Sequence, residues 1–186
     1  MEKGVVINGV KWATRNVDNP DTFVANPEDS GKFYQWNRKT AWASTGDVTN
    51  WDNRESIGDT WEKSNDPSPI GWRVPTAIEI DSLLDYKKVA FEFEDVNGVN
   101  GMKFTDKVTG NSIFLPAVGA RLDRGIQFDF RRCNGGELDG AAGYSGSYWS
   151  STANGNTNAD TLVFGMIPSR FLGNRNCGKC IRSVAE

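Results

Sequence analysis

Three cysteines are the first residues in this chain that could do chemistry. Cys177 and Cys180 form a C-x-x-C motif, a spacing found in redox-active disulfides and in zinc sites. The motif lies in a Gly/Asn-rich stretch, has no second C-x-x-C, and the chain contains no histidine. With Cys133 the number of cysteines is odd, so they cannot all pair within one chain. Free thiols or one incidental disulfide are therefore favoured over a metal or redox centre.

Hydroxyl and guanidinium groups are the next candidates for chemistry. The run Ser150-Ser151-Thr152 could supply a nucleophile, but there is no histidine to act as a base and no G-x-S-x-G motif. Arg73 and Arg182 could bind an anion, although a structural role in bonding loop carbonyls or a buried carboxylate is favoured. We therefore expect no catalytic residue, no metal ligand and no cofactor, and predict that the protein is not an enzyme.

Composition predicts one loop-rich domain over residues 1–186. The chain is 38% hydrophobic, and 7 Trp, 10 Phe and 4 Tyr can build a core although aliphatic residues are sparse. Twenty glycines indicate many tight turns. A net charge of -3 gives no case for a nucleic-acid partner or an anionic membrane. No signal peptide and no transmembrane run is present in this chain, so we expect no direct membrane insertion.

The elements that would position these residues are short. Asn8-Gly9 between two apolar runs predicts a β-hairpin. Thr76 and Glu79 form a capping box, which predicts a helix over 77–86. Further strands are expected at 31–36, 112–116, 125–133, 147–151, 161–164 and 179–184. The long polar stretch 40–66 carries three tryptophans that we expect to pin it onto the body. The fold class is α+β, with short, mostly antiparallel strands, one or two helices and long loops.

The last forty-odd residues alternate between rigid apolar motifs and stretches that look unconstrained. The unconstrained stretches are 153–160, rich in Asn and Gly, and 167–177. A chain that fixes its core and leaves the intervening surface loose is suited to binding. Exposed ligand-binding candidates lie at Ser145, Ser147, Asn154, Asn156, Asp160, Thr161, Arg170, Phe171, Leu172, Asn174 and Asn176. Arg170 and Phe171 are the first choices as anchors, because an aromatic side chain beside arginine is typical of interface hot spots. The alternative is that Phe171 and Leu172 fold back onto the core.

Five motifs together resemble a known family. In chain order they are Trp12-Ala13-Thr14-Arg15-Asn16, Gly71-Trp72-Arg73-Val74-Pro75-Thr76, Phe114-Leu115-Pro116-Ala117-Val118-Gly119-Ala120-Arg121, Tyr148-Trp149-Ser150-Ser151-Thr152 and Ile181-Arg182-Ser183-Val184. The chain resembles the Fibrobacter major paralogous domain of gut Bacteroidetes over about residues 10–184. The resemblance implies a C-type lectin-like fold, related to that of formylglycine-generating enzymes, in a surface or secreted protein.

Some members of this family are variable proteins of diversity-generating retroelements, which mutate adenines near the 3′ end of the gene. Diversified Asn codons cannot yield Trp, Lys, Glu, Gln or Met, and residues 169–177 contain none of these. The resemblance therefore implies a candidate variable region at 144–178. One departure concerns two family cysteines, which are replaced here by Ser68 and Ser183. A bridge between them would contribute roughly 4 kcal/mol in the chain-entropy model, so packing must compensate for its loss.

Two family activities are disfavoured. Calcium-dependent sugar binding needs clustered oxygen ligands, and Asn26-Pro27-Glu28 and Trp51-Asp52-Asn53 resemble the family's calcium motifs but lie in the wrong half of the chain. Cys177 and Cys180 do not map onto the cysteine pair of a formylglycine-generating oxidase. We expect a diversified ligand-binding domain on a cell surface, secreted or on a phage virion, which binds a protein or glycan on another cell or particle. The alternative is a non-variable glycan-binding or adhesin module, and an oxidase is less favoured.

Overall fold

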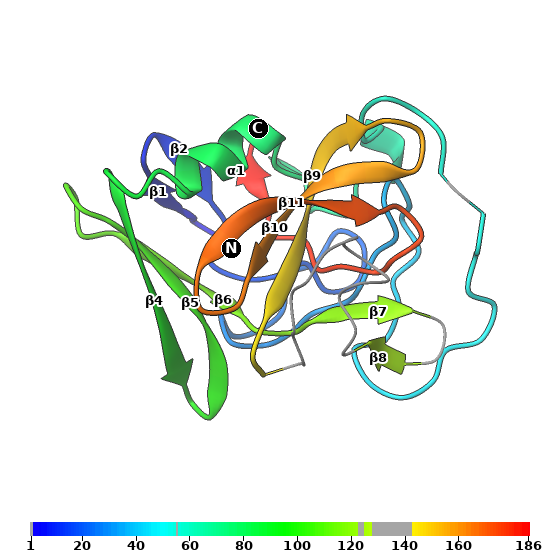
Figure 1. The fold of residues 1–186 in the computed structure, drawn as a ribbon, viewed down its shortest axis with the longest axis horizontal. Helices are drawn as coiled ribbons and strands as arrows, with labels where there is room; N and C mark the ends of the chain where they lie inside the picture. The colour runs from blue at the N-terminus through cyan, green and yellow to red at the C-terminus, as the bar shows by residue number, and fades with distance from the viewer. Residues whose placement is uncertain (1, 55, 123–124, 128–142) are drawn as a thin grey trace.

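A computed structural model describes residues 2–54, 56–122, 125–127 and 143–186 (Figure 1). The architecture is α+β: its strands pair mainly in antiparallel fashion, and the described part holds one α-helix and one short 3-10 helix, Lys63–Asn65. Long loops connect these elements, as the abundance of glycine predicts.

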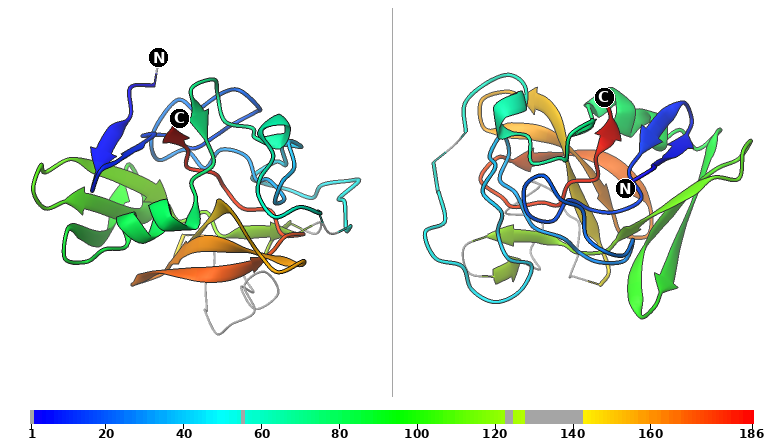
Figure 2. Two further views of the ribbon diagram at one scale, coloured as in Figure 1. Left: turned by 90° about the horizontal axis from the view of Figure 1, so that it is seen from above. Right: turned by 180° about the vertical axis from the view of Figure 1, so that it is seen from behind.

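A four-stranded sheet joins the two ends of the chain. It contains β1 (Val5–Ile7), β2 (Val10–Trp12), β12 (Val184–Ala185) and β3 (Trp72–Arg73), in the order β1-β2-β12-β3. Figure 2 shows the blue and red ends side by side. The hairpin predicted at Asn8-Gly9 is confirmed, with φ of 44° and 82° at the two turn residues.

Two three-stranded sheets form most of the remaining structure. One is β4 (Val89–Val96), β5 (Val99–Asp106) and β6 (Ser112–Pro116), paired in that order. The other has the order β11-β10-β9 and contains β9 (Gly146–Asn154), β10 (Asn158–Phe164) and β11 (Pro168–Asn174). The strands β7 (Ala120–Leu122) and β8 (Gly125–Gln127) form a separate two-stranded sheet.

Helix α1 (Ala77–Leu83) begins where the capping box predicts. The Thr76 side chain accepts a hydrogen bond from the Glu79 N–H, and the Glu79 carboxylate accepts one from the Thr76 N–H. The helix ends three residues before the predicted position. The backbone turns there, and the Asp85 carbonyl accepts hydrogen bonds from the backbone N–H groups of Lys88 and Val89. Its buried face packs toward β9, β10 and β11, so α1 covers one side of that sheet.

The sheet β9–β11 lies between two hydrophobic clusters. Tyr148 and Leu162 belong to a cluster with Ile80 and Leu83 of α1, whereas the adjacent Trp149 belongs to a second cluster built from other tryptophans. Neighbouring residues of a strand face opposite sides, so both faces of this sheet are covered. Of the aromatic residues in the five family motifs, Tyr148, Trp149 and Phe114 are buried, while Trp72 is only half-buried.

Several predicted boundaries are wrong. Residues 167–177 were expected to form an unconstrained loop, but Pro168–Asn174 pair along their whole length with β10. The segment 31–36 is not a strand and makes only isolated bridges at Phe33 and Tyr34. The strand expected at 179–184 is reduced to β12, with bridges at Lys179 and Cys180. Of the strand expected at 125–133, β8 accounts for 125–127, and the remainder lies outside the described residues.

Both framework arginines have the structural role expected for them. Arg182 is fully buried, and it donates from Nε to the Asn16 side chain at 2.9 Å and from Nη1 to the Ala13 carbonyl. Burial lowers the pKa of Arg182 to about 10, so the guanidinium remains charged at neutral pH. Arg73 forms a two-pronged ion pair with Glu79, with a shortest N–O distance of 2.6 Å. Both guanidinium groups therefore bond to other residues of the fold.

The serines at the two family cysteine positions lie in contact. Ser68 Oγ is 2.8 Å from Ser183 Oγ, and both side chains are buried, although 115 positions separate them in sequence. The C-x-x-C motif does not form a bridge of its own, because Cys177 is disulfide-bonded while Cys180 is a free, buried thiol. Burial raises the pKa of the Cys180 thiol well above its ordinary value.

Candidate ligand-binding surface

The eleven predicted binding residues divide into three groups by exposure. Asn154, Asn156, Arg170 and Leu172 are exposed, and Phe171, Asn174 and Asn176 are partly buried. The remaining four, Ser145, Ser147, Asp160 and Thr161, are buried, so the expectation that they are exposed is wrong. For Asp160 and Thr161 the physical reason is the position of β10 in the middle of a sheet that is covered on both faces. Spacing in the sequence could not reveal that the strand is central.

The buried members of the set bond to the interior. Thr161 Oγ1 donates to the Phe171 carbonyl at 3.0 Å, which ties β10 to β11. Ser147 Oγ accepts a hydrogen bond from Lys179 Nζ at 2.8 Å. Both side chains of that second contact are fully buried, and burial lowers the pKa of Lys179 to about 7. A serine beside a lysine of lowered pKa can act as a nucleophile, but a substrate cannot reach this hydroxyl as it is packed here.

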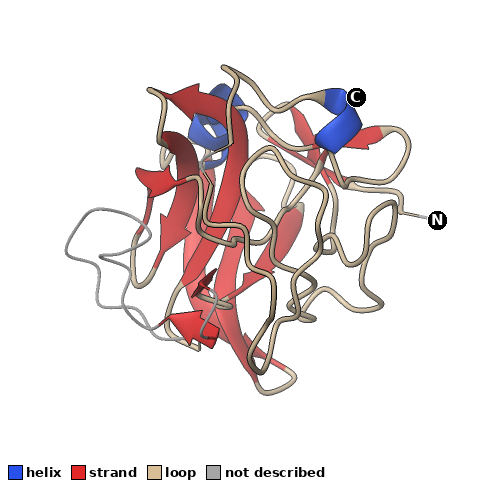
Figure 3. Ribbon diagram, turned by 90° about the vertical axis from the view of Figure 1, so that its right-hand side faces the viewer, coloured by secondary structure: helices blue, strands red, loops and turns tan. Residues whose placement is uncertain are grey.

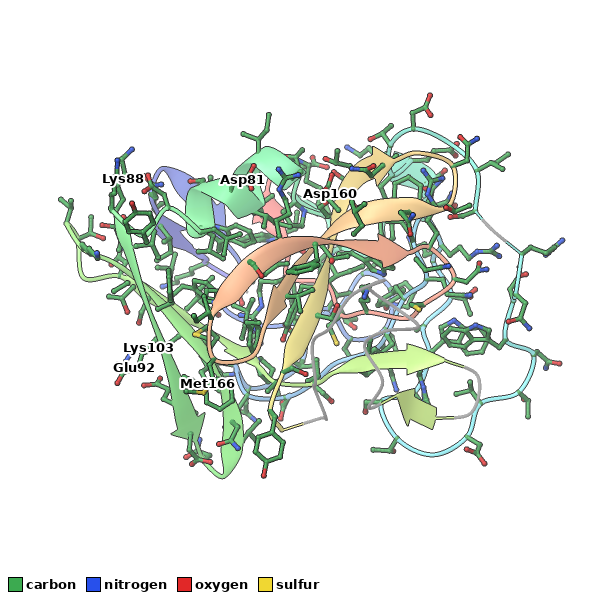
Figure 4. All side chains as sticks on the ribbon, in the orientation of Figure 1. Asp81, Lys88, Glu92, Lys103, Asp160 and Met166 are labelled. Carbon is green, nitrogen blue, oxygen red and sulfur yellow. The ribbon has the colours of Figure 1, made fainter. Side chains whose placement is uncertain are left out.

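A depression of about 550 Å³ lies between α1 and the exposed side of β11. Its lining residues are Asp81, Leu84, Asn154, Asp160, Arg170, Phe171 and Leu172. Figure 4 shows Asp81 and Asp160 close to each other at the upper rim. The structure thus brings together five of the residues predicted from sequence and adds two from the helix. These two were missed because α1 is more than sixty positions away in the chain.

Arg170 is held in place by two carboxylates within this depression. Its Nε lies 2.8 Å from an Asp81 oxygen, and its Nη1 lies 2.8 Å from an Asp160 oxygen. The Asp160 side chain is 6% exposed, whereas that of Arg170 is 39% exposed. The two carboxylates therefore hold the Arg170 guanidinium in one orientation and compensate its charge. Arg170 stabilises the base of the depression and is poorly suited to attract an anion.

Four exposed apolar side chains belong to the candidate variable region. Tyr144, Met166, Ile167 and Leu172 are 71%, 85%, 74% and 40% exposed, respectively. Tyr144 precedes β9, whose Gly146 pairs with Phe164 of β10, and Met166 and Ile167 form the β10–β11 turn that follows Phe164. Leu172, which pairs with Asp160, lies toward the opposite end of β11 from Met166 and Ile167, so the four side chains do not form one patch. Met166 and Ile167 are not among the binding residues predicted from the sequence. Two consecutive large apolar residues after a glycine were nevertheless a usable signal of an exposed apolar turn.

Two residues inside the stretch 169–177 belong to the framework. Arg175 is 1% exposed and donates to the carbonyls of Ser56, Gly155 and Asn158 at 2.9, 2.8 and 3.1 Å. Its guanidinium also lies 4.1 Å from the ring centroid of Trp36. At Gly173 an added Cβ would lie 2.7 Å from Thr161 Cγ2 and 3.0 Å from Trp149 Cζ3. Neither position can accept arbitrary side chains.

No family model matches this chain. Searches of curated proteins and of solved structures also give no match.

Two further observations bear on the class of site. Among the described residues, no three His, Cys, Asp or Glu side chains are grouped so that they could hold a metal ion. No helix in the described ranges is long and apolar enough to cross a membrane. The candidate site is thus a mixed surface of amide, apolar and ion-paired side chains on one sheet and one helix.

Proposed function

We propose that this protein is a ligand-recognition domain that binds through the exposed side of β11, the β9–β10 turn and the neighbouring end of α1. The observation that carries the proposal is the combination of a sheet buried on both faces with exposed side chains at Asn154, Asn156, Arg170 and Leu172. A rigid scaffold limits the entropy lost on binding, so its exposed side chains can be exchanged without refolding the site.

The proposed family is the Fibrobacter major paralogous domain, with a C-type lectin-like fold. The contact between Ser68 and Ser183 supports it, because these positions carry the expected cysteine pair in that family. We further propose a variable protein of a diversity-generating retroelement, displayed on a cell surface or a phage particle, with a protein or glycan ligand on another cell or particle. Support comes from the exposed asparagines at the end of β9 and after it.

Sequencing beyond the 3′ end of the gene tests this proposal. We expect a near-copy of the segment for residues 144–178, close to a reverse transcriptase gene, that differs only where the copy has adenine. The structure sharpens the expected pattern. Differences should fall on codons of exposed or half-exposed residues such as Asn156, Leu172 and Asn174, and should spare Gly173 and Arg175, where a new side chain would clash or leave carbonyls unbonded.

The pattern of differences is as informative as their presence. A copy whose differences fall evenly on buried and exposed codons would contradict the assignment of the surface. The absence of any copy would remove the retroelement and leave the alternative, an adhesin or glycan-binding module of fixed specificity.

One observation favours that alternative. A cavity of about 370 Å³ lies next to β3, with Trp61 and Trp72 among its lining residues together with Lys39, Asp66 and Ser151. Indole faces beside polar groups suit the stacking of sugar rings, and the volume is within the range of ligand pockets. Binding to a glycan array by the unmodified protein, without a template copy in the genome, would favour this second function.

Leu172→Ala tests the surface without disturbing the core. Because Leu172 is 40% exposed on an edge strand, we expect its loss to change the free energy of unfolding by less than about 0.5 kcal/mol. Chemical denaturation measures this value. The free energy of unfolding of Phe171→Ala, on the opposite face of β11, serves as the comparison. Binding of both variants to any ligand found on the glycan array is then measured. A loss of stability above about 2 kcal/mol for Leu172→Ala would show that Leu172 belongs to the core.

A further inference from the structure

The strand β4 has one long edge without a neighbouring strand. It is an outer strand of the sheet β4-β5-β6, and its eight residues pair with β5 in one unbroken register. Among the described residues, no backbone hydrogen bond reaches residues 90–96 from outside this sheet. Figures 1 and 2 show β4 at the border of the molecule, whereas loops cover most of the opposite end, which faces the viewer in Figure 3. An exposed strand edge of this length is a template for pairing with another strand.

Alternate residues of β4 direct their backbone groups to this edge. The Lys107 N–H donates to the Lys88 carbonyl at 2.8 Å, so Lys88 and every second residue after it bond toward β5. The N–H and C=O groups of Phe91 and Phe93 therefore point outward. The strand contains no proline and no bulge, two features by which natural edge strands prevent pairing.

The charged side chains of β4 are divided between its two ends. Two lysines come just before the strand and three carboxylates occupy its second half: Lys87, Lys88, Glu92, Glu94 and Asp95. Figure 4 shows Lys88 at one end of the strand, and Glu92 beside Lys103 farther along. The strand thus has a basic end and an acidic end.

Neighbouring residues do not remove this division. The basic end also contains Lys107 and the carboxylate of Asp85, and the acidic end also contains Lys103 and Glu28. Within the described ranges, the one ion pair at the acidic end joins Lys103 to Glu94, with an N–O distance of 3.6 Å. The excess charge is therefore positive at one end of β4 and negative at the other.

We propose that β4 pairs in antiparallel fashion with β4 of a second copy of this chain, across a two-fold axis at Phe91. Antiparallel pairing places the basic end of each strand beside the acidic end of the other. A strand with such a division of charge is therefore complementary to itself, and this selects a second copy as the occupant. The two three-stranded sheets would join into one continuous sheet.

The side chains of β4 fit this register. With the axis at Phe91, the two Phe91 side chains lie opposite each other, and Val89 lies opposite Phe93 of the second copy. Lys88 then lies opposite Glu94 of the second copy. Aromatic pairs and pairs of opposite charge stabilise neighbouring strands. Phe91 and Phe93 are half-buried in one copy, so the second copy would cover apolar surface that remains exposed.

Neighbouring registers are less favourable. An axis at Glu92 would place the two Glu92 side chains opposite each other, and an axis at Phe93 would place Glu92 opposite Glu94 of the second copy. Like charges directly opposite each other destabilise a strand pair. An axis at Ala90 would shift the pairing into the turn before Val89, so fewer residues of β4 would pair.

The inference rests on β4 and not on the proposed function. The candidate binding residues lie on β9, β10 and β11 and the segments beside them, and none of them belongs to β4. A pair of copies would present the candidate surface twice, and two linked sites bind a multivalent target more tightly than one.

Sedimentation velocity of the whole chain tests the pairing. The protein is measured from about 1 µM to about 1 mM, because small interfaces associate weakly. We expect the mass to rise from one copy to two and no further, since a two-fold pair uses the free edge of both strands. Lys88→Glu and Glu94→Lys should each weaken the pairing at least about tenfold, because each places like charges opposite each other. A mixture of these two variants should pair again, since opposite charges face each other in the mixed pair.

Amide hydrogen exchange locates the contact. The N–H groups of Phe91 and Phe93 should exchange several-fold more slowly at the highest concentration than at the lowest, because pairing protects them. The N–H groups of Glu92 and Glu94 bond toward β5 in either state, so their exchange should change little.

Matched controls separate the β4 edge from other surfaces. Lys11→Glu changes the net charge as Lys88→Glu does but lies on β2, so it should not affect pairing. Leu172→Lys adds a charge to the edge strand β11 and should also have no effect. Unchanged thermal midpoints show that each variant is folded.

Any one of four results would overturn the proposal: the mass of one copy at every concentration, growth beyond two copies, loss of pairing in Leu172→Lys, or a mixture of Lys88→Glu and Glu94→Lys that stays unpaired. These outcomes are distinguishable from those of the proposed function. A template copy without pairing contradicts only the β4 interface, whereas pairing without a template copy contradicts only the diversification.

Discussion

Replacing Ser68 and Ser183 together by cysteine is expected to stabilise the protein by about 4 kcal/mol once the bridge forms. The two hydroxyl oxygens are already 2.8 Å apart in a buried site, so the side chains point at each other. The two positions are 115 residues apart, and closing so long a loop removes much of the entropy of the unfolded chain. Little backbone movement is needed to bring two sulfurs to bonding distance.

The free energy of unfolding under oxidising and reducing conditions measures this effect. The unmodified protein must be measured alongside, because reduction also affects the existing disulfide of Cys177. Each single variant, Ser68→Cys and Ser183→Cys, should be no more stable than the original, since it loses the buried hydroxyl pair and gains no bridge. A double variant that forms the bridge but gains under about 1 kcal/mol would show that the site is strained when bridged.

Arg175→Ala is expected to lower the free energy of unfolding by about 3–5 kcal/mol. The substitution removes donors to three carbonyls, those of Ser56, of Gly155 in the β9–β10 turn and of Asn158 in β10. It also removes the contact with Trp36 and leaves a cavity where a fully buried side chain stood. Buried carbonyls without a donor add their desolvation cost.

Urea denaturation of three variants tests this role. Asn156→Ala lies in the turn that Arg175 supports, but it is exposed and should change stability by less than about 0.5 kcal/mol. Arg175→Lys keeps the charge but cannot reach three carbonyls at once, so an intermediate loss is expected. Equal stability for Arg175→Ala and Asn156→Ala would contradict the framework role.

The Arg175 prediction concerns the division between framework and variable surface. Arg175 is within the permitted amino-acid set and within the stretch 169–177, so composition alone classed it with the variable residues. Its burial places it with the framework instead. If it contributes as expected, selection would hold it fixed while Asn174 and Asn176 on either side remain open to change.

Local chemistry in the sequence determined the elements that depend on neighbouring residues. The turn at Asn8-Gly9 requires positive φ, which these two residues tolerate, and the capping box at Thr76 and Glu79 involves residues three apart. The strand that ends at Pro116 and the burial of Tyr148 and Trp149 also follow from side-chain type and position. Such features are decided within a few residues, so a single sequence is enough to predict them.

Tertiary structure decided which residues reach the surface. The residues Ser147 and Asp160 look like exposed polar positions in the sequence, yet both faces of their sheet are covered, and their side chains bond to Lys179 and Arg170 within the fold. Ser56 and Asp81 of α1 are held beside the candidate site from positions far away in the chain, through Arg175 and Arg170. Exposure depends on what packs against a strand from elsewhere, and that information is spread over the whole chain and is not contained in any one segment.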